Sequence, residues 1–92
     1  MSLRFEWDER KDAGNLRKHG VGFEEAATVF GDVLSLTISD PDHSEGEDRF
    51  ISLGMSHRGR LLVVIHTERG DRIRIISARL AAANERKQYE RD

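Results

Sequence analysis

Basic side chains that could contact phosphate groups gather in the second part of this 92-residue chain. Residues 57–92 carry 9 Lys and Arg against 5 Asp and Glu, whereas residues 1–56 carry 6 against 12. Arg72 and Arg74 alternate with isoleucines, so in a β-strand both arginines point to one face. An arginine-rich face of this kind indicates a local phosphate-binding surface, although solvated strand arginines give the same pattern.

Arg79 follows the same expected strand. Because Ser77 can cap a helix, we expect Arg79 in the first turn of a C-terminal helix. Backbone N–H groups at a helix start favour an anion, so Arg79 would complete a phosphate cradle there. Alternatively, Arg79 pairs with an acid such as Glu6 or Glu47 and holds the last helix in place.

Lys18 and His19 end an expected helix that begins at the N-cap Asp8 and is followed by Gly20. Lysine suits phosphate contact and histidine suits proton transfer. The two need not act together, since helix neighbours point about 100° apart. A purely structural role is also open, because the helix dipole favours cations at this end.

His43, Glu47 and Arg49 lie in or beside an acidic loop, residues 40–48. Glu47 could be a general base, could hold the guanidinium of Arg49 square to a phosphate, or could belong to a solvated loop. The spacing His43-x-x-x-Glu47 with neighbouring acids could also bind a divalent ion. No second histidine stands at ligand spacing, so we predict no metal site and no cofactor.

The elements that position these residues follow from hydrophobic periodicity and turn residues. We expect a strand at 5–7, helices at 8–19 and 23–30, strands at 34–38, 50–54, 61–65 and 72–76, and a helix from 78 to about 91. Ala13 and Leu16 form the apolar stripe of the first helix. Four consecutive strands with short connections predict an antiparallel four-stranded meander with helices on one face, an α+β fold of order β-α-α-β-β-β-β-α.

The composition bounds the class of protein. With 37% hydrophobic and 35% charged residues, residues 1–92 suit one domain with a modest core. The absence of cysteine excludes disulfides and thiolate metal sites. The longest apolar run, Leu61 to Ile65, is strand-sized and no signal-peptide layout is present, so we expect a cytoplasmic protein without a membrane partner. A net charge of −2 argues against coating nucleic acid through bulk charge.

Six short motifs, in order and spacing, resemble the BrnT family of toxins from type II toxin–antitoxin systems. They span about residues 5–89 and read Phe5-Glu6-Trp7-Asp8, Asn15-x-x-Lys18-His19-Gly20, Phe23-Glu24-Glu25-Ala26, Val29-Phe30, His43-Ser44 through Glu47 with Arg49-Phe50, and Arg74-Ile75-Ile76-Ser77-Ala78-Arg79. The chain departs from the family pattern at Gly22, where a serine or aspartate cap is common, and at His66, where tyrosine is common. We assign no role to His57 or His66, and expect His66 to end a strand at the solvent boundary.

The resemblance implies a RelE-like fold and a ribonuclease that cleaves RNA and thereby halts translation. It also implies inhibition by a BrnA-like antitoxin, a heterotetrameric complex with that antitoxin, and DNA contact only through the antitoxin. Metal-independent cleavage by 2′-OH attack needs a base, an acid and cations for the charged phosphorane. The residues that match these needs are Lys18, His19, Glu47, Arg49 and Arg79 as catalytic groups, and His43, Arg60, Arg72 and Arg74 as RNA contacts.

Two other functions are compatible with the sequence. The first is a binding module without catalysis that acts as corepressor for a DNA-binding partner; loss of the chemical groups would favour it, and those groups are present. The second is a metal-dependent hydrolase, which a strong chelator would inactivate.

Overall fold

The computed structural model describes residues 3–40, 42 and 47–91. Its helices and strands, in chain order, are β1 (Arg4–Glu6), α1 (Glu9–His19), α2 (Phe23–Ala27), the 3-10 helix η1 (Thr28–Gly31), β2 (Leu36–Ser39), β3 (Arg49–Met55), β4 (Leu61–Arg69), β5 (Arg72–Leu80) and α3 (Ala83–Tyr89). This confirms the predicted α+β class and the order β-α-α-β-β-β-β-α. Among the described residues, no helix has the length and apolar composition needed to cross a bilayer.

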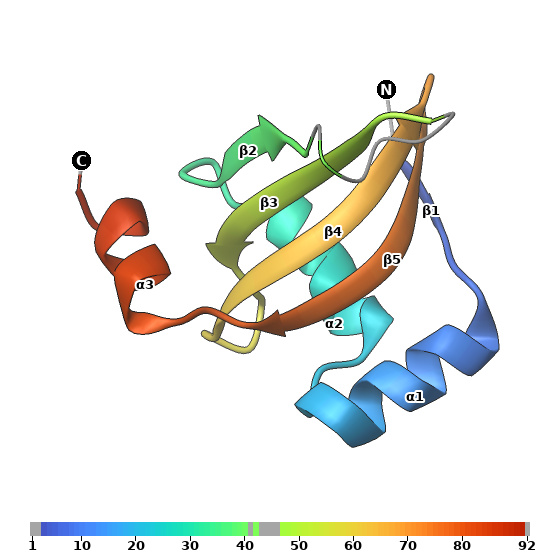
Figure 1. Ribbon diagram of the computed structural model, residues 1–92, viewed down its shortest axis with the longest axis horizontal. Coiled ribbons are helices and arrows are strands. Elements are labelled where there is room, and N and C mark those ends of the chain that lie inside the picture. Colours follow the sequence, from blue (N-terminus) through green and yellow to red (C-terminus); the bar gives the residue numbers. More distant parts are fainter. Residues whose placement is uncertain (1–2, 41, 43–46, 92) are drawn as a thin grey trace.

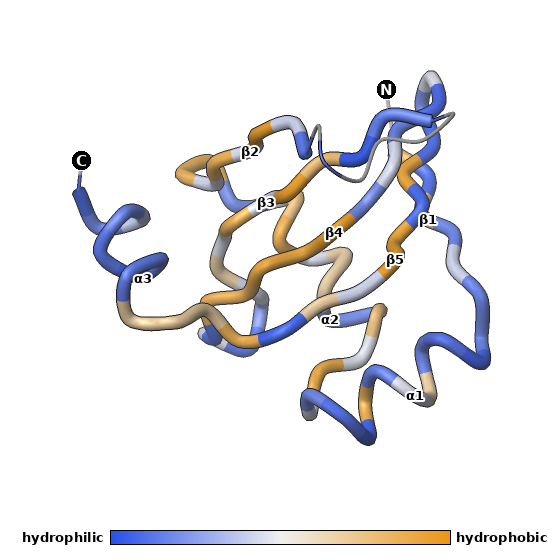
Figure 2. The backbone as a smooth tube through the Cα atoms, in the orientation of Figure 1, coloured by the Kyte–Doolittle hydropathy of each residue, from blue (hydrophilic) through white to orange (hydrophobic). Residues whose placement is uncertain are grey.

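The five strands form one sheet in the order β1-β5-β4-β3-β2. Strands β2 to β5 make the predicted antiparallel meander, and β1 lies parallel to the first residues of β5 (Figure 1). The apolar run that begins β4 is buried from Leu61 to Val64, as expected for a central strand covered on both faces. Figure 2 shows this hydrophobic centre along β3 and β4, with hydrophilic backbone along α3 and most of α1.

The helices lie on both faces of the sheet, so the prediction that they share one face was wrong. Residues of α2 and η1 pack with Leu62, Val64 and Ile75 in the main core. On the opposite face, α3 contributes Tyr89 to a smaller cluster with Leu61 and Val63. No residue of α3 is fully buried against this second face. We therefore call it the open face of the sheet, although α3 lies over part of it.

Helix α1 is held by Asn15 and not by the predicted apolar stripe. Ala13 is exposed and Leu16 is 55% exposed, whereas Asn15 is buried. The Asn15 amide donates to the carbonyls of Val21 and Ala78, each at 2.8 Å, and its oxygen accepts the Ala78 N–H at 3.2 Å. Since β1 pairs with β5 only at residues 72–74, this amide takes the place of a neighbouring strand at Ala78.

Strand β5 runs four residues further than predicted, which moves the start of the last helix. Ser77 and Arg79 belong to the strand, and α3 begins at Ala83, so Ser77 caps no helix. Pairing with the nine-residue β4 extends to Leu80, opposite Leu62. Tertiary pairing of this kind overrides the helix propensity of an alanine-containing segment.

His66 lies in the interior of β4, which corrects the expectation of a solvent boundary. Its side chain is fully buried between Phe30, in an edge-to-face contact at 4.7 Å, and Phe50, in a stacked contact at 5.9 Å. Its Nε2 lies 2.8 Å from Ser52 Oγ, which is itself 2.8 Å from Thr37 Oγ1. Burial lowers the pKa of His66 to about 4, so the ring is neutral at pH 7.

Candidate functional site

A β-bulge places the three predicted arginines of β5 on one face. Arg74 lies opposite Thr67 and Arg79 opposite Val63, but between them the register with β4 shifts by one residue at Ile76. Strand side chains alternate, so Arg74 and Arg79, five residues apart, would point to opposite faces in a regular strand. The extra residue restores a common direction. Arg72, Arg74 and Arg79 therefore all lie on the open face.

At one end of this row, two arginines share the carboxylate of Glu6. Arg72 Nη1 lies 3.6 Å from Glu6 Oε1, and Arg74 Nη1 donates to Glu6 Oε2 at 3.3 Å. Strand β1 brings Glu6 there, because Glu6 lies opposite Arg74 in the parallel register. One carboxylate is thus shared by two guanidinium groups whose side chains are 61% and 41% exposed.

Glu47 also lies at this end, and its ion-pair partner among the described residues is Arg69, at the end of β4. This hydrogen bond raises the pKa of Arg69. From the sequence, Glu47 could be a general base, could orient Arg49 or could belong to a solvated loop, and its pairing with Arg69 was not expected. Arg49 starts β3 opposite Thr67 and interacts with neighbours of its own. The register Arg49–Thr67–Arg74 places Arg49 on the same open face.

At the other end of β5, Arg79 is held by Glu85 of α3. Arg79 Nη1 and Nη2 donate to the two carboxylate oxygens of Glu85, both at 2.8 Å. These bonds hold the pKa of Glu85 at about 2 and raise the pKa of Arg79. Glu85 also accepts the backbone N–H of Ala82 at 2.8 Å, which starts α3. The predicted cradle of Arg79 at a helix start is thus replaced by a bidentate ion pair across the strand–helix connection.

The acid that pairs with Arg79 was named wrongly from the sequence. Glu6 and Glu47 were the suggested partners, yet both lie at the opposite end of β5. Glu85 follows Arg79 by six residues. Side chains six residues apart in one helix do not face each other, so the expected helix gave no reason to pair them. With the strand ending at Leu80, the same spacing lets the chain turn back on itself.

Lys18 and His19 lie at the Arg79 end of the sheet. Gly20, directly after them, accepts a hydrogen bond of 3.0 Å from Arg60 Nη2, and Arg60 immediately precedes β4. The start of β4 lies beside the end of β5, since Ala81 N–H donates to the Leu61 carbonyl at 2.9 Å. Lys18 is exposed and His19 half-buried. They end α1, whose Asn15 bonds to Ala78 at a stretch of the β5 edge that β1 leaves uncovered.

Arg60, which was expected to contact RNA, has a structural partner in Glu25. Glu25 of α2 is buried, and it accepts hydrogen bonds from Arg60 and, at 2.7 Å, from Ser56 Oγ. The Arg60 hydrogen bond lowers the pKa of Glu25. Arg58 adds a longer contact of 3.7 Å. Arg60 thus joins the β3–β4 turn to α1 and α2, which leaves its guanidinium less available to RNA.

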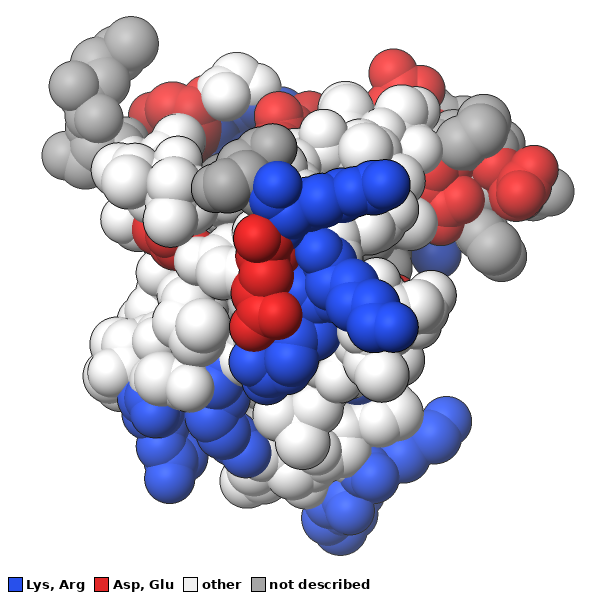
Figure 3. Space-filling view, turned by 90° about the vertical axis from the view of Figure 1, so that its left-hand side faces the viewer, with Lys and Arg blue, Asp and Glu red and all other residues white. Residues whose placement is uncertain are grey.

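The predicted site residues therefore divide between two ends of the sheet. Arg74 and Arg79 are five positions apart along β5, a distance of about 15 Å. Glu47, Arg49, Arg72 and Arg74 lie at one end, while Lys18, His19, Arg60 and Arg79 lie at the other. His43 lies outside the described residues. Figure 3, which shows the side of the molecule where α3 lies, has basic and acidic side chains in contact near its centre and further basic ones along its lower edge.

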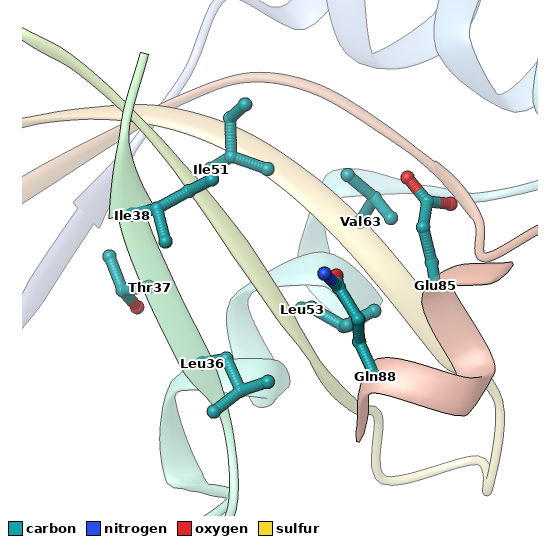
Figure 4. A pocket seen from close by; sticks show the side chains of 8 residues that line it. All are labelled: Leu36, Thr37, Ile38, Ile51, Leu53, Val63, Glu85 and Gln88. Atoms are coloured by element: carbon teal, nitrogen blue, oxygen red, sulfur yellow. The ribbon is translucent and has the colours of Figure 1, made fainter. Parts of the chain in front are cut away.

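A hollow of about 410 Å³ lies on the open face between β2, β3, β4 and α3. Aliphatic side chains of the strands form most of its lining, and Glu85 and Gln88 reach into it from α3 (Figure 4). The lining residues are Leu36, Thr37, Ile38, Ile51, Leu53, Val63, Glu85 and Gln88. Since Glu85 also holds Arg79, the hollow opens next to the arginine row.

Within the part of the chain that the structure describes, no three His, Asp or Glu side chains are grouped so that they could hold a metal ion. The alternative metal site at His43 and Glu47 includes a residue outside that part. The groups that the described site offers are guanidinium, ammonium, imidazole and carboxylate, which bind anions and transfer protons.

The fold and this site define a small α+β protein whose exposed sheet face carries a row of arginines paired with carboxylates. The model of the family described as the ribonuclease toxin BrnT of type II toxin–antitoxin systems matches residues 7–85, and the chain belongs to this family. A toxin of such a system has an antitoxin protein as its partner. No curated protein matches the chain.

The fold is similar to the crystal structure of the ribonuclease toxin BrnT from Brucella abortus. The TM-score is 0.63 at 23% sequence identity, and the match covers 88% of this chain and 99% of the Brucella chain. The likeness extends over nearly the whole of both chains, which supports the α+β architecture described above.

Proposed function

We propose that this toxin is a metal-independent endoribonuclease that cleaves RNA by attack of a 2′-OH on the neighbouring phosphate. The observation that carries the proposal is the alignment of Arg72, Arg74 and Arg79 on one exposed face, which requires a bulge in β5. A row of guanidinium groups along a strand matches the repeated charge of a phosphate backbone. Family membership supplies the class of reaction.

The chemical step is best supported at the Arg79 end. Arg79 is the guanidinium that would stabilise the negative charge of the phosphorane, an effect typically worth about 10²–10³-fold in rate. The half-buried His19 would serve in proton transfer, and the exposed Lys18 in phosphate contact. An RNA strand that crosses the uncovered edge of β5 near Ala78 would meet groups from both faces of the sheet.

The arginines at the other end of the row would then bind the RNA away from the cleaved bond. Arg72 and Arg74 share one carboxylate, so a phosphate can approach without displacing a full ion pair from each. Arg49 belongs to the same surface by its register opposite Thr67. In this arrangement Glu47 holds Arg69 and so limits how Arg69 can turn, in place of the base role considered for it.

In the cell, we expect this cleavage to inhibit translation and a BrnA-like antitoxin to neutralise it. The antitoxin would cover the open face and its arginines, and a DNA-binding segment of the antitoxin would make any DNA contact. A heterotetramer of two toxins and two antitoxins is the expected complex. If the complex left Arg74 and Arg79 open to solvent, direct occlusion would be refuted.

The decisive experiment is cleavage of a labelled RNA by the purified full chain in the presence of EDTA. The proposal expects cleavage with a 2′,3′-cyclic phosphate product, and none when the nucleotide before the cleaved bond lacks its 2′-OH. Arg79→Ala should lower kcat/KM by about 10²–10³-fold. Arg10→Ala, at an exposed position of α1, is the matched control and should cleave normally.

Two outcomes would contradict the proposal. Cleavage that EDTA abolishes and added metal restores would show a metal-dependent enzyme. Normal growth during strong expression, together with tight antitoxin binding and no RNA cleavage, would instead show a binding module.

A further inference from the structure

We infer that the hollow beneath α3 is a guanine-binding subsite, in which Glu85 reads the base and thereby releases Arg79 for the phosphate. The inference rests on the proposed RNA cleavage and adds to it the base that the site selects.

The shape and lining of the hollow suit one unstacked base. Its volume of about 410 Å³ lies in the range of small-ligand pockets. The strands supply aliphatic walls such as Leu53 and Val63, which can cover the faces of a planar ring. Polar groups come mainly from α3, where Glu85 and Gln88 reach inward to meet the edge of a ring (Figure 4). Proteins that recognise RNA by sequence commonly bind unstacked bases in this way.

Glu85 already accepts hydrogen bonds from two parallel N–H groups, the same arrangement of donors that guanine presents. Its two oxygens accept from Nη1 and Nη2 of Arg79 at 2.8 Å each, so the carboxylate is matched to two parallel N–H donors. The Watson–Crick edge of guanine offers such a pair in N1–H and the 2-amino group, which are part of a guanidine unit. Adenine, cytosine and uracil have no two adjacent donors there. The low pKa of Glu85 keeps it ionised and thus an acceptor only.

The exchange on Glu85 would couple base recognition to phosphate binding. In the free protein, the side chain of Arg79 is 45% exposed and its guanidinium is occupied by Glu85. When guanine takes over both oxygens of Glu85, Arg79 is free to pair with the phosphate of the same strand. Every donor and every charge then keeps a partner, because the phosphate replaces the carboxylate on Arg79. Bases without the donor pair leave Arg79 held by Glu85.

The first test changes the RNA and leaves the protein intact. Oligonucleotides that differ only in the base beside the cleaved bond should be cut about tenfold faster with guanine than with adenine, cytosine or uracil. Inosine lacks the 2-amino group and should also lose about tenfold, whereas 7-deazaguanine, which keeps both donors, should be cut like guanine. Equal cleavage of all these substrates would overturn the subsite.

Glu85→Gln should abolish the guanine preference, and Lys87→Ala, on an exposed position of α3, should keep it. Because Glu85 also helps to start α3, a second measurement uses the unaltered chain. Guanosine monophosphate should shift the NMR methyl signals of Leu53 and Val63, while adenosine monophosphate and inorganic phosphate should not. Equal shifts with both nucleotides, or shifts only with the antitoxin, would contradict a guanine subsite.

The two proposals can fail separately. If guanosine monophosphate shifts these methyl signals but no RNA is cut, the ribonuclease proposal fails and the subsite stands. If RNA is cut without base preference and the signals stay in place, only the subsite fails.

Discussion

The phenol of Tyr89 donates a 2.6 Å hydrogen bond to Oδ2 of Asp32, and this bond ties the C-terminal helix to the turn before β2. The same oxygen accepts the backbone N–H of Met55 at 2.8 Å. Together with the Arg79–Glu85 pair, the Tyr89 bond fixes α3 at both of its ends over the hollow. Since α3 buries no residue fully, these polar contacts add to the packing of Tyr89 against Leu61 and Val63 in holding the helix there.

Tyr89→Phe should release the C-terminal end of α3. The variant keeps the ring and loses a hydrogen bond to a carboxylate, so we expect a loss of about 1–2 kcal/mol in the free energy of unfolding, measured in urea. Amide hydrogen exchange of α3 should quicken more than that of β4. Lys87→Ala is the control. If the α3 amides exchange at the wild-type rate, the Tyr89 bond does not anchor the helix.

Asn15→Ala should destabilise the protein by about 3 kcal/mol. It removes the hydrogen bonds to Val21 and Ala78, and leaves the buried backbone groups of Ala78 without their partner. Leu16→Ala, at a neighbouring exposed position, should change the free energy of unfolding by less than about 0.5 kcal/mol. A larger effect at Leu16 than at Asn15 would restore the apolar stripe as the means by which α1 is held.

Lowering the pH should destabilise the fold through His66. The pKa of His66 is about 4 in the folded protein and about 6.5 in the unfolded chain, so the unfolded state binds more protons as the pH falls below 6.5. The stability that neutral His66 provides is complete above pH 6.5 and is lost towards pH 4. Between pH 7 and pH 5 we expect a loss of about 2 kcal/mol, measured by urea unfolding at each pH.

His66→Gln is the matching variant for this prediction. It should remove most of the slope between pH 7 and pH 5, even if its stability at pH 7 is lower. An unchanged slope would assign the pH dependence to other groups.

Arg60→Ala tests whether Arg60 serves the fold or the RNA. The substitution leaves the buried Glu25 with only Ser56 and the distant Arg58, so we expect a loss of about 3 kcal/mol in the free energy of unfolding. Arg58→Ala, at a largely exposed side chain, should cost less than about 1 kcal/mol. RNA cleavage by the folded fraction of Arg60→Ala should stay near normal. If Arg60→Ala kept full stability but showed a large drop in kcat/KM, Arg60 would be an RNA contact, as first expected.

The order of elements was predictable because the pattern of hydrophobic residues marks the strands and helices, and turn-forming residues such as glycine mark their ends. The apolar run from Leu61 to Val64 is a buried central strand, and Gly20, with φ of 70°, ends α1 as expected. The end of β5 was not predictable in this way. Ala78 lies in a strand because it pairs with Val64 of β4 and bonds to Asn15, which is 63 residues away in the chain.

The site was only partly predictable for a related reason. Strand alternation correctly placed Arg72 and Arg74 together, since they are close in sequence. The partners of the charged residues were missed, because Arg69 with Glu47 and Arg79 with Glu85 meet only through tertiary pairing or a chain reversal. His66 was misplaced because its burial depends on the two aromatic rings that enclose it. A single sequence carries no local signal for such contacts.

The unpaired Ile76 has a consequence for how this strand tolerates changes in length. Deleting Ile76 would let β5 pair with β4 without interruption, and the ladder would gain regularity. Arg74 and Arg79 would then be four residues apart, so ordinary strand alternation would keep both on the open face. One residue inserted beside Ile76 without a second bulge would instead turn Arg79 toward the helices, away from Arg72 and Arg74. The bulge and the length of β5 must therefore change together for the arginine row to survive.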